Sequence, residues 1–260
     1  MSLHYGNTWI TRHAFKRHWR LNKINLSVVI PAYNESGNIQ ECLKSLEAQT
    51  RRADEIIVVD NESEDDTAEI ARAFGVKVLS YPRPYQHHGD IGLVRQKGTE
   101  EAAGDIIVST DADCTYPPDW LEKIEKHFAS NPKLVLVGGP VYASNPDLWS
   151  QWIMNVGSWG RSYVNGWGIP YFLAANTSFR KSAFLLAGGG YRGAAGHGPV
   201  EEWIISFRLS RVGEWLWDDE LMCYTKVAEC WRTYSALLPA SVAPLGTWAA
   251  VGSLQGSIIA

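Results

Sequence analysis

Short apolar runs alternate with segments of helical periodicity through the first half of this chain. Within the helical segments, apolar residues recur every three or four positions, as at Ile39, Leu43 and Leu46. We expect helices at about 36–48, 64–74, 91–103 and 117–130. Strands that alternate with helices predict an α/β fold, a parallel sheet covered on both faces. The expected strands are Leu26–Ile30, Glu55–Asp60, Val76–Ser80, the apolar part of Asp105–Asp113, and Leu134–Gly138.

Two carboxylates, Asp111 and Asp113, follow one of these strands with a single residue between them. In an open α/β sheet the ligand crevice lies beyond the carboxyl ends of the strands. Neighbouring carboxylates repel each other unless a positive group compensates them. Mg²⁺ or Mn²⁺ carrying a diphosphate suits such a pair, because these cations prefer oxygen ligands. A solvated acidic turn is the alternative interpretation of the same residues.

Composition is that of an ordinary globular enzyme, with 260 residues, 45% hydrophobic residues and a net charge of −4. The absence of a linker or an internal repeat favours one domain, and the net charge gives no argument for nucleic acid as a partner. The four cysteines fit neither a metal-binding spacing nor a redox pair, which indicates reduced thiols in a cytosolic protein. We expect Cys114, directly after the acidic pair, to be partly accessible.

The two ends of the chain are unusual. Residues 12–23 combine five Lys or Arg residues with aromatic side chains and no acid, so they could lie on an anionic membrane surface or form a solvated helix. The N-terminus lacks the apolar core of a signal peptide. Thr233–Ala260 carries no charge, yet its apolar residues never reach the ~20 consecutive positions of a spanning helix. A cytoplasmic location follows as the expectation, with peripheral association at the inner face of the membrane as a further option.

Tryptophan and tyrosine are concentrated between residues 149 and 172, separated by glycines. These aromatic side chains could pack as part of the core. They could also form an acceptor platform, because aromatic faces stack on sugar rings and lipid tails.

Four segments in order resemble the inverting family 2 glycosyltransferases, which have the GT-A nucleotide-diphospho-sugar transferase fold. The resemblance covers about residues 26–215, and the motifs are specific in this order and spacing. The segments are Val29–Glu35 (VIPAYNE), Ile56–Thr67 (IIVVDNESEDDT), Val94–Gly98 with Ala103–Leu121, and Ala187–Tyr191 followed by Glu201–Leu209.

The resemblance implies a Rossmann-like, mostly parallel central sheet with helices on both faces and an aromatic-rich acceptor half. A single domain would span 26–232, with a nucleotide-sugar-binding half at 26–140 and an acceptor and catalytic half at 141–232. A basic extension at 1–25 and an uncharged tail at 233–260 would flank it.

By the same resemblance, Pro31, Tyr33 and Glu35 match the loop that holds the base and ribose of the nucleotide. Asp60 matches the acid that contacts the nucleobase at the end of the second strand. A carboxylate there can accept the hydrogen-bond donors that a base offers.

Arg95 matches the basic residue near the pyrophosphate. Asp113 would ligate Mn²⁺ or Mg²⁺, and Asp111 would touch the ribose or the sugar and share the metal site. A cation and an arginine would neutralise the diphosphate as it leaves.

The general base is where the sequence departs from the family, which usually has Glu-Asp before an aromatic residue. Here the pair is Glu201 and Glu202, and Glu202 falls at the position of the base. Both acids could instead favour the dipole of a helix first turn. The glycine-rich Gly188–Gly198 loop is a candidate lid, and its His197 is either a third metal ligand or an ordinary loop residue. Asn61 and Gln96 also depart from the family pattern.

The expected function is transfer of a sugar from a UDP- or GDP-sugar to a hydroxyl or phosphate of a carbohydrate or lipid-linked acceptor, with inversion and with a metal. One alternative is a nucleotide-sugar-binding protein that is impaired in catalysis. The other is a sugar nucleotidylyltransferase, which would need a basic, glycine-rich loop in place of Pro31–Glu35.

Overall fold

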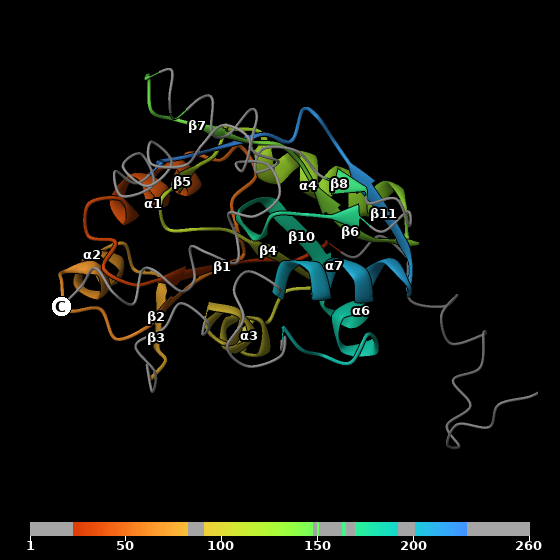
Figure 1. Ribbon diagram of the computed structural model, residues 1–260, viewed down its shortest axis with the longest axis horizontal. Helices are drawn as coiled ribbons and strands as arrows, with labels where there is room; N and C mark the ends of the chain where they lie inside the picture. Colours follow the sequence, from red (N-terminus) through yellow and green to blue (C-terminus); the bar gives the residue numbers. More distant parts are fainter. Residues whose placement is uncertain are drawn as a thin grey trace, which may run out of the picture.

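A seven-stranded sheet in the order β11-β6-β10-β4-β1-β2-β3 forms the centre of the molecule (Figure 1). The computed structural model describes residues 23–82, 91–147, 150, 163–164, 170–191 and 201–227. The central strands are β1 (Leu26–Ala32), β2 (Glu55–Asp60), β3 (Lys77–Ser80), β4 (Ile106–Ser109), β6 (Leu134–Gly138), β10 (Thr177–Arg180) and β11 (Glu214–Trp217). Six of these strands run parallel to one another, and β10 runs antiparallel between β4 and β6.

Alternate residues of the central strands belong to two separate hydrophobic clusters. Val28 and Ile30 face one cluster, whereas Val29 faces the other, as expected for a sheet buried on both sides. Apolar residues of α1 (Ile39–Glu47), α2 (Thr67–Ala73) and α4 (Trp120–Ser130) cover the first face. The second face is covered by α3 (Ile91–Glu101), α6 (Lys181–Leu186) and α7 (Glu201–Ser210), which lie together on one side of the sheet in Figure 1.

Each predicted strand and helix of the first half is present, with shifted boundaries. The first strand continues through Pro31 to Ala32, beyond the predicted end at Ile30. The pairing of β1 with β4 stops at Val29 and Ser109, and only β2 pairs with the last three residues of β1. Proline is tolerated there because one side of the strand has no ladder partner.

A small sheet stands beside the carboxyl end of β4. It contains β5 (Cys114–Thr115), β12 (Cys223–Thr225) and β7 (Val141–Ala143), in the order β5-β12-β7. Two further short strands, β8 (Tyr163–Val164) and β9 (Pro170–Tyr171), pair with each other. The 3-10 helix η2 (Ala174–Asn176) leads into β10. The small sheet brings the C-terminal part of the described chain against the acidic pair.

Gly139 shows how tightly the small sheet joins the central one. A Cβ atom at this position would lie 1.9 Å from the carbonyl oxygen of Leu221. Asn176 joins the same regions, because its side-chain amide donates to the carbonyl oxygens of Pro140 and Leu221 at 3.0 and 2.6 Å. Its Oδ1 accepts a bond from Trp120 Nε1 at 3.0 Å.

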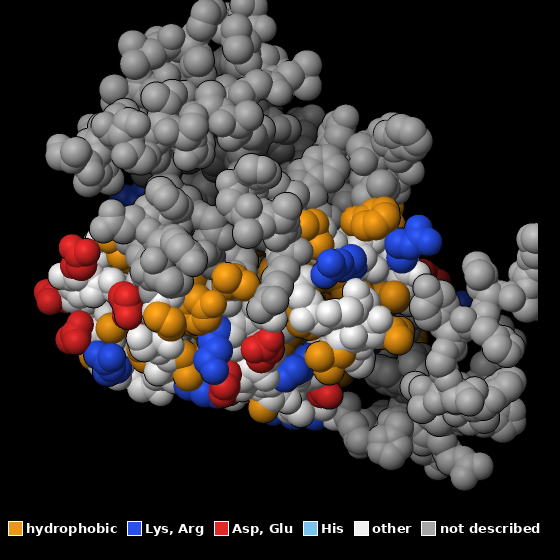
Figure 2. Space-filling view, turned by 60° about the horizontal axis from the view of Figure 1, so that its bottom comes forward, with side chains coloured by type: hydrophobic (Ala, Val, Ile, Leu, Met, Phe, Trp, Pro, Cys, Tyr) orange, Lys and Arg blue, Asp and Glu red, His pale blue; other side chains and the backbone are white. Residues whose placement is uncertain are grey.

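The face of the molecule shown in Figure 2 mixes hydrophobic, basic and acidic side chains over its described surface. Its described part therefore carries no extended field of one charge. Leu185, Leu186 and Phe207 are the most exposed large apolar side chains of α6 and α7. No helix in the described ranges has both the length and the apolarity required to span a membrane.

Candidate active site

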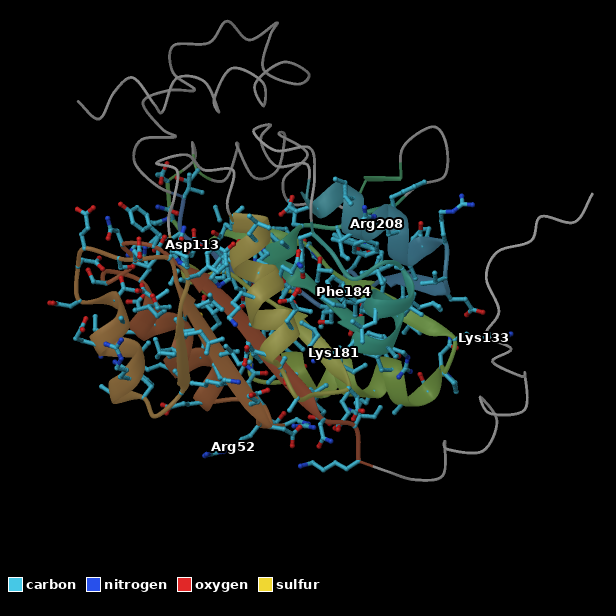
Figure 3. The ribbon with its side chains drawn as sticks, turned by 90° about the horizontal axis from the view of Figure 1, so that it is seen from below. Arg52, Asp113, Lys133, Lys181, Phe184 and Arg208 are labelled. Atoms are coloured by element: carbon cyan, nitrogen blue, oxygen red, sulfur yellow. The ribbon has the colours of Figure 1, made fainter. Side chains whose placement is uncertain are left out.

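Three loops meet at one edge of the sheet because β1, β2 and β4 run parallel. Tyr33 and Glu35 follow β1, Asp60 ends β2, and Asp111 and Asp113 follow β4. Figure 3 shows Asp113 at this edge, with Arg52 at the opposite edge of the molecule. The structure therefore brings together the residues that the sequence placed at strand ends.

The loops after β1 and β2 are held to each other by reciprocal hydrogen bonds. The backbone N–H of Asn34 donates to Ser63 Oγ at 2.9 Å, and that of Glu64 donates to Asn34 Oδ1 at 2.8 Å. Asn34 and Glu62 have φ angles of 53° and 57°, in the left-handed region. Residues other than glycine rarely adopt this backbone conformation unless other contacts compensate for it. At Asn34, the hydrogen bonds to Ser63 and Glu64 provide such contacts.

Asp65 also links the loops after β1 and β2. Its carboxylate accepts the backbone N–H groups of Ser36 and Thr67, each at 3.0 Å, and the hydroxyl of Thr67. Burial by itself would raise the pKa of Asp65, but these hydrogen bonds lower it to about 2.

Arg95 extends from α3 under the acidic pair and is 2% exposed. Its guanidinium forms an ion pair with Asp111 and donates to the carbonyl oxygen of Thr110 at 2.7 Å and to Ser109 Oγ at 3.2 Å. Burial would lower the pKa of Arg95, but the carboxylate of Asp111 raises it above its usual value, so the guanidinium stays charged. Its Nε is buried and has no hydrogen-bond partner within the described residues.

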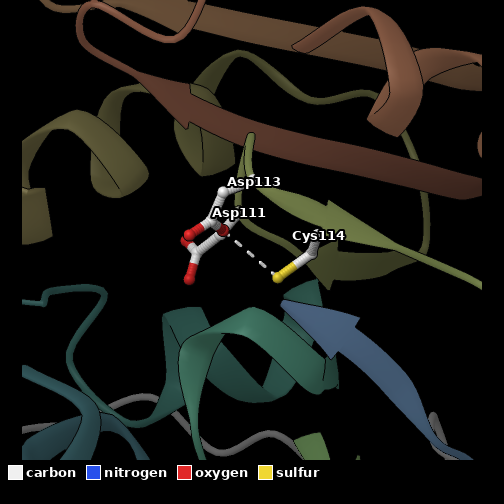
Figure 4. A group of neighbouring side chains, drawn as sticks. All are labelled: Asp111, Asp113 and Cys114. Carbon is white, nitrogen blue, oxygen red and sulfur yellow. Dashed lines mark hydrogen bonds between the residues drawn. The ribbon is translucent and has the colours of Figure 1, made fainter. Parts of the chain in front are cut away.

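Asp113 is the second carboxylate of the pair, and neutral side chains donate to it. One carboxylate oxygen accepts a hydrogen bond from Cys114 Sγ at 3.3 Å (Figure 4). The other accepts one from Thr225 Oγ1 of β12 at 3.2 Å. Burial, followed by the charges of Asp111 and Glu35, raises the pKa of Asp113 to about 7. An ionised Asp113 is therefore costly unless a cation joins it.

Glu35 faces the same cluster from the β1 loop. Asn38 Nδ2 donates to its Oε2 at 2.8 Å. Burial raises the pKa of Glu35, and the charges of Asp111 and Asp65 raise it further. Three carboxylates thus converge on a region where the cation of Arg95 compensates Asp111 directly.

Asp60 and Asn61 present acceptor atoms at the end of β2. Asp60 is 8% exposed, and the backbone N–H of Ser63 approaches its two carboxylate oxygens at 3.4 Å. The buried Oδ1 of Asn61 has no partner in the part of the chain that the structure describes. Such an acceptor costs free energy until a donor reaches it.

Glu202 lies in the first turn of α7, where the sequence placed a candidate base. The backbone N–H of Ala174 donates to its Oε1 at 2.9 Å, and this contact orients the carboxylate. Glu202 is near enough to Arg95 for its charge to contribute to the raised pKa of the guanidinium. The dipole of a helix N-terminus also favours a carboxylate in this turn, so both interpretations of the residue describe the same geometry.

The donor set fits a divalent cation. One ligand atom from each of Asp111, Asp113 and Cys114 can be chosen so that all three lie within 4.8 Å of one another. Two carboxylates offer the oxygen ligands that Mg²⁺ and Mn²⁺ prefer. Burial, followed by the charges of Asp111 and Glu35, raises the pKa of Asp113, so a cation bound here would favour its ionised form.

Sequence reasoning missed Thr225 and misjudged Cys114. The expectation that Cys114 is partly accessible is wrong, because its side chain is 0% exposed in the interface between β5 and β12. A burial pattern cannot be read from two-residue strands. Several of the expected features lie outside the described residues. They are the side chain of Glu201, residues 192–198 of the expected lid with His197, the basic extension up to 22, and the uncharged tail at 233–260. The side chains of the aromatic segment up to Tyr171 also lie outside the described residues.

The chain is similar in sequence to known glycosyltransferases. The model of the family described as glycosyl transferase family 2 matches residues 27–186. Glycosyltransferase AglE of Haloferax volcanii is 37% identical over 126 residues, which cover 47% of this chain and 41% of that protein. The undecaprenyl-phosphate 4-deoxy-4-formamido-L-arabinose transferase of Pseudomonas aeruginosa is 32% identical over 137 residues, covering 49% and 38%. The chain thus spans about two fifths of the length of these relatives.

Among solved structures, the mannosyltransferase of Pyrobaculum calidifontis in complex with GDP-Man and Mn²⁺ superposes with a TM-score of 0.60. The match covers 83% of this chain and 62% of that protein at 19% identity. The shared architecture is the GT-A fold, a mixed α/β arrangement with a mostly parallel central sheet.

Proposed function

This chain belongs to glycosyl transferase family 2, and on that premise we propose that it transfers a sugar from a nucleoside-diphosphate sugar to an acceptor hydroxyl or phosphate with inversion. The observation that carries the proposal is the convergence of Asp111, Asp113 and Arg95 at the sheet edge, with Glu202 near the same guanidinium.

The loops after β1 and β2 would hold the nucleotide. Asp60 and Oδ1 of Asn61, which has no partner among the described residues, would accept the N–H donors of a nucleobase. Pro31, Tyr33 and Glu35 would line the base and ribose from the β1 side. The hydrogen bonds between Asn34 and Ser63 and between Glu64 and Asn34 support this role, because they shape the two loops before a ligand arrives.

Asp113, with Asp111, would hold a divalent cation such as Mn²⁺ or Mg²⁺, which when bound supplies positive charge to the departing diphosphate. Arg95 takes a different part from the one implied by the family pattern. Its two terminal nitrogens are occupied by Asp111 and the backbone after β4, so we assign it to positioning Asp111 and compensating its charge.

Glu202 would accept the proton of the acceptor hydroxyl. The acceptor oxygen would then form its bond to the anomeric carbon on the face opposite the diphosphate, while the bond from that carbon to the phosphate oxygen breaks. The configuration inverts because a single displacement occurs. Such a base contributes roughly 10²- to 10⁴-fold to the rate. A phosphate acceptor would need less help, because its oxygen is already ionised at neutral pH.

A lipid-linked acceptor is favoured by the relative whose name specifies undecaprenyl phosphate. The basic, aromatic segment at 12–23 would suit binding to an anionic membrane surface, where a lipid-linked acceptor would lie. A carbohydrate acceptor remains the second option within the same reaction.

The test is a turnover assay with α-linked UDP- and GDP-sugars, Mn²⁺, and polyprenyl phosphate or simple sugars as acceptors. Release of nucleoside diphosphate measures turnover, and proton NMR of the product gives the anomeric configuration. A β-linked product supports the proposal. An α-linked product would overturn the inverting mechanism, and the absence of turnover with every donor would overturn the activity.

A further inference from the structure

A thiol stands beside the two carboxylates of the candidate metal site. Cys114 Sγ lies 3.3 Å from Asp113 Oδ1 and donates a hydrogen bond to it (Figure 4). Sγ belongs to the same compact group of ligand atoms as the carboxylates of Asp111 and Asp113. Cys114 directly follows Asp113 in the sequence and is the first residue of β5.

The distance between sulfur and oxygen is one that a shared cation would require. Zinc binds thiolate sulfur at about 2.3 Å and carboxylate oxygen at about 2.0–2.2 Å, so two such ligands at 90° to 109° lie about 3.0–3.7 Å apart. The observed 3.3 Å falls within this range. To bind a cation, the thiol would have to lose its proton.

We propose that Cys114 is a third ligand of the divalent cation and makes this site bind thiophilic cations, Zn²⁺ and Cd²⁺, more tightly than Mg²⁺. The inference rests on the metal site of the proposed function. Soft thiolate ligands favour these cations, whereas Mg²⁺ prefers oxygen alone. As the bond from sulfur to the cation forms, the Sγ–H bond breaks and its proton passes to solvent.

Cys42 provides a control because its thiol faces a backbone oxygen, whereas the thiol of Cys223 also forms a hydrogen bond with that of Cys114. Cys42 Sγ donates to the carbonyl oxygen of Asp111 at 3.5 Å, and Cys223 Sγ donates to that of Ala175 at 3.9 Å. All three thiols are completely buried, so burial does not distinguish them. Among these three thiols, only that of Cys114 donates to a carboxylate of the pair.

The experiment is a titration of the full chain with Cd²⁺ alone, followed by the ultraviolet charge-transfer band of cadmium thiolate and by calorimetry. The wild type should show the band with one Cd²⁺ bound and one proton released. Cys114→Ser should lose the band and bind Cd²⁺ at least about tenfold more weakly, the loss that even outer-shell changes can cause. Cys42→Ser, the matched control, should keep both.

A band that persists in Cys114→Ser would overturn the proposal, as would calorimetric binding of Cd²⁺ to the wild type without any band. The second result needs no variant, so it decides even if Cys114→Ser and Cys114→Ala fail to fold. Binding of Mn²⁺ with a nucleotide, measured separately by thermal shift, distinguishes this failure from failure of the proposed function. If Mn²⁺ and nucleotide bind but the Cd²⁺ band is absent, only the role of Cys114 is refuted.

Discussion

The guanidinium of Arg95, with a side chain only 3% exposed, forms an ion pair with the carboxylate of Asp111, which is 31% exposed. The pair links α3 to the segment after β4. Burial, followed by the charges of Asp111 and Glu35, raises the pKa of the neighbouring Asp113 to about 7. Asp111 is thus compensated by a cation of the protein, whereas Asp113 accepts hydrogen bonds from the neutral side chains of Cys114 and Thr225.

Replacing Arg95 by leucine should destabilise the protein by about 3 kcal/mol, because the carboxylate of Asp111 would lose its partner inside the acidic cluster. Arg95→Lys should lower the free energy of unfolding by less, because lysine keeps the positive charge. Urea unfolding measures both. The matched control is Arg72→Ala, which removes an exposed pair with Glu69 and should cost about 0–1 kcal/mol. Equal losses for Arg95→Leu and Arg72→Ala would show that the buried pair is unimportant for stability.

Glu202→Gln should lower kcat by about 10²- to 10⁴-fold and leave nucleotide binding unchanged, because the amide keeps an acceptor for the Ala174 N–H but cannot take a proton. Steady-state kinetics with a hydroxyl acceptor and a thermal shift with nucleotide provide the two readouts. Glu220→Gln, at an exposed site, serves as the control. Wild-type turnover that is already negligible, and the same in Glu202→Gln, would instead indicate a nucleotide-sugar-binding protein.

Gly139→Ala should cost at least about 1–3 kcal/mol, because its Cβ would meet the Leu221 carbonyl oxygen at 1.9 Å and push the small sheet away. Gly37→Ala has open space around the new Cβ and should change stability by no more than about 0.5 kcal/mol. Chemical unfolding compares the two variants. A neutral Gly139→Ala would mean that the junction between the two sheets is looser than described.

Acid should destabilise the wild type partly through Asp65. Its pKa is about 2 in the folded state and 3.8 in the reference state, so the folded form is favoured when the carboxylate is ionised. This contribution is complete above the reference value and is lost as the pH falls through about 2. The unfolding free energy of Asp65→Asn should therefore depend less on pH between 4 and 2 than that of the wild type. Parallel pH profiles of the two proteins would contradict this assignment.

The sequence predicted the first half of the fold well because its strands are apolar and its helices are clearly amphipathic. Leu26–Ala32 and Ile106–Ser109 each place successive residues in opposite clusters, the arrangement that a doubly covered sheet requires. The parallel pairing of β1 with both β2 and β4 then brings Asp60 and Asp111 to one edge of the sheet.

The second half resisted prediction because its elements depend on tertiary contacts. The strand β10 has the sequence TSFR, and β5 has two residues, so neither shows a periodicity that could be recognised. The contact from Thr225 to Asp113 spans 112 positions of the chain, and no local pattern specifies it. Arg95 illustrates the same limit, since its motif marked its importance but not that it would bind Asp111.

The most direct test of the metal and diphosphate site is a thermal-shift panel with UDP, GDP and their sugar conjugates, each with Mn²⁺, Mg²⁺ or EDTA. The wild type should be stabilised by one nucleotide class in the presence of metal, by about 2.7 kcal/mol at 100 times its dissociation constant. EDTA and Asp113→Asn should each remove this stabilisation. An absence of stabilisation by every nucleotide, or an equal stabilisation in EDTA, would contradict the proposal that Asp111 and Asp113 hold a cation for a nucleoside-diphosphate sugar.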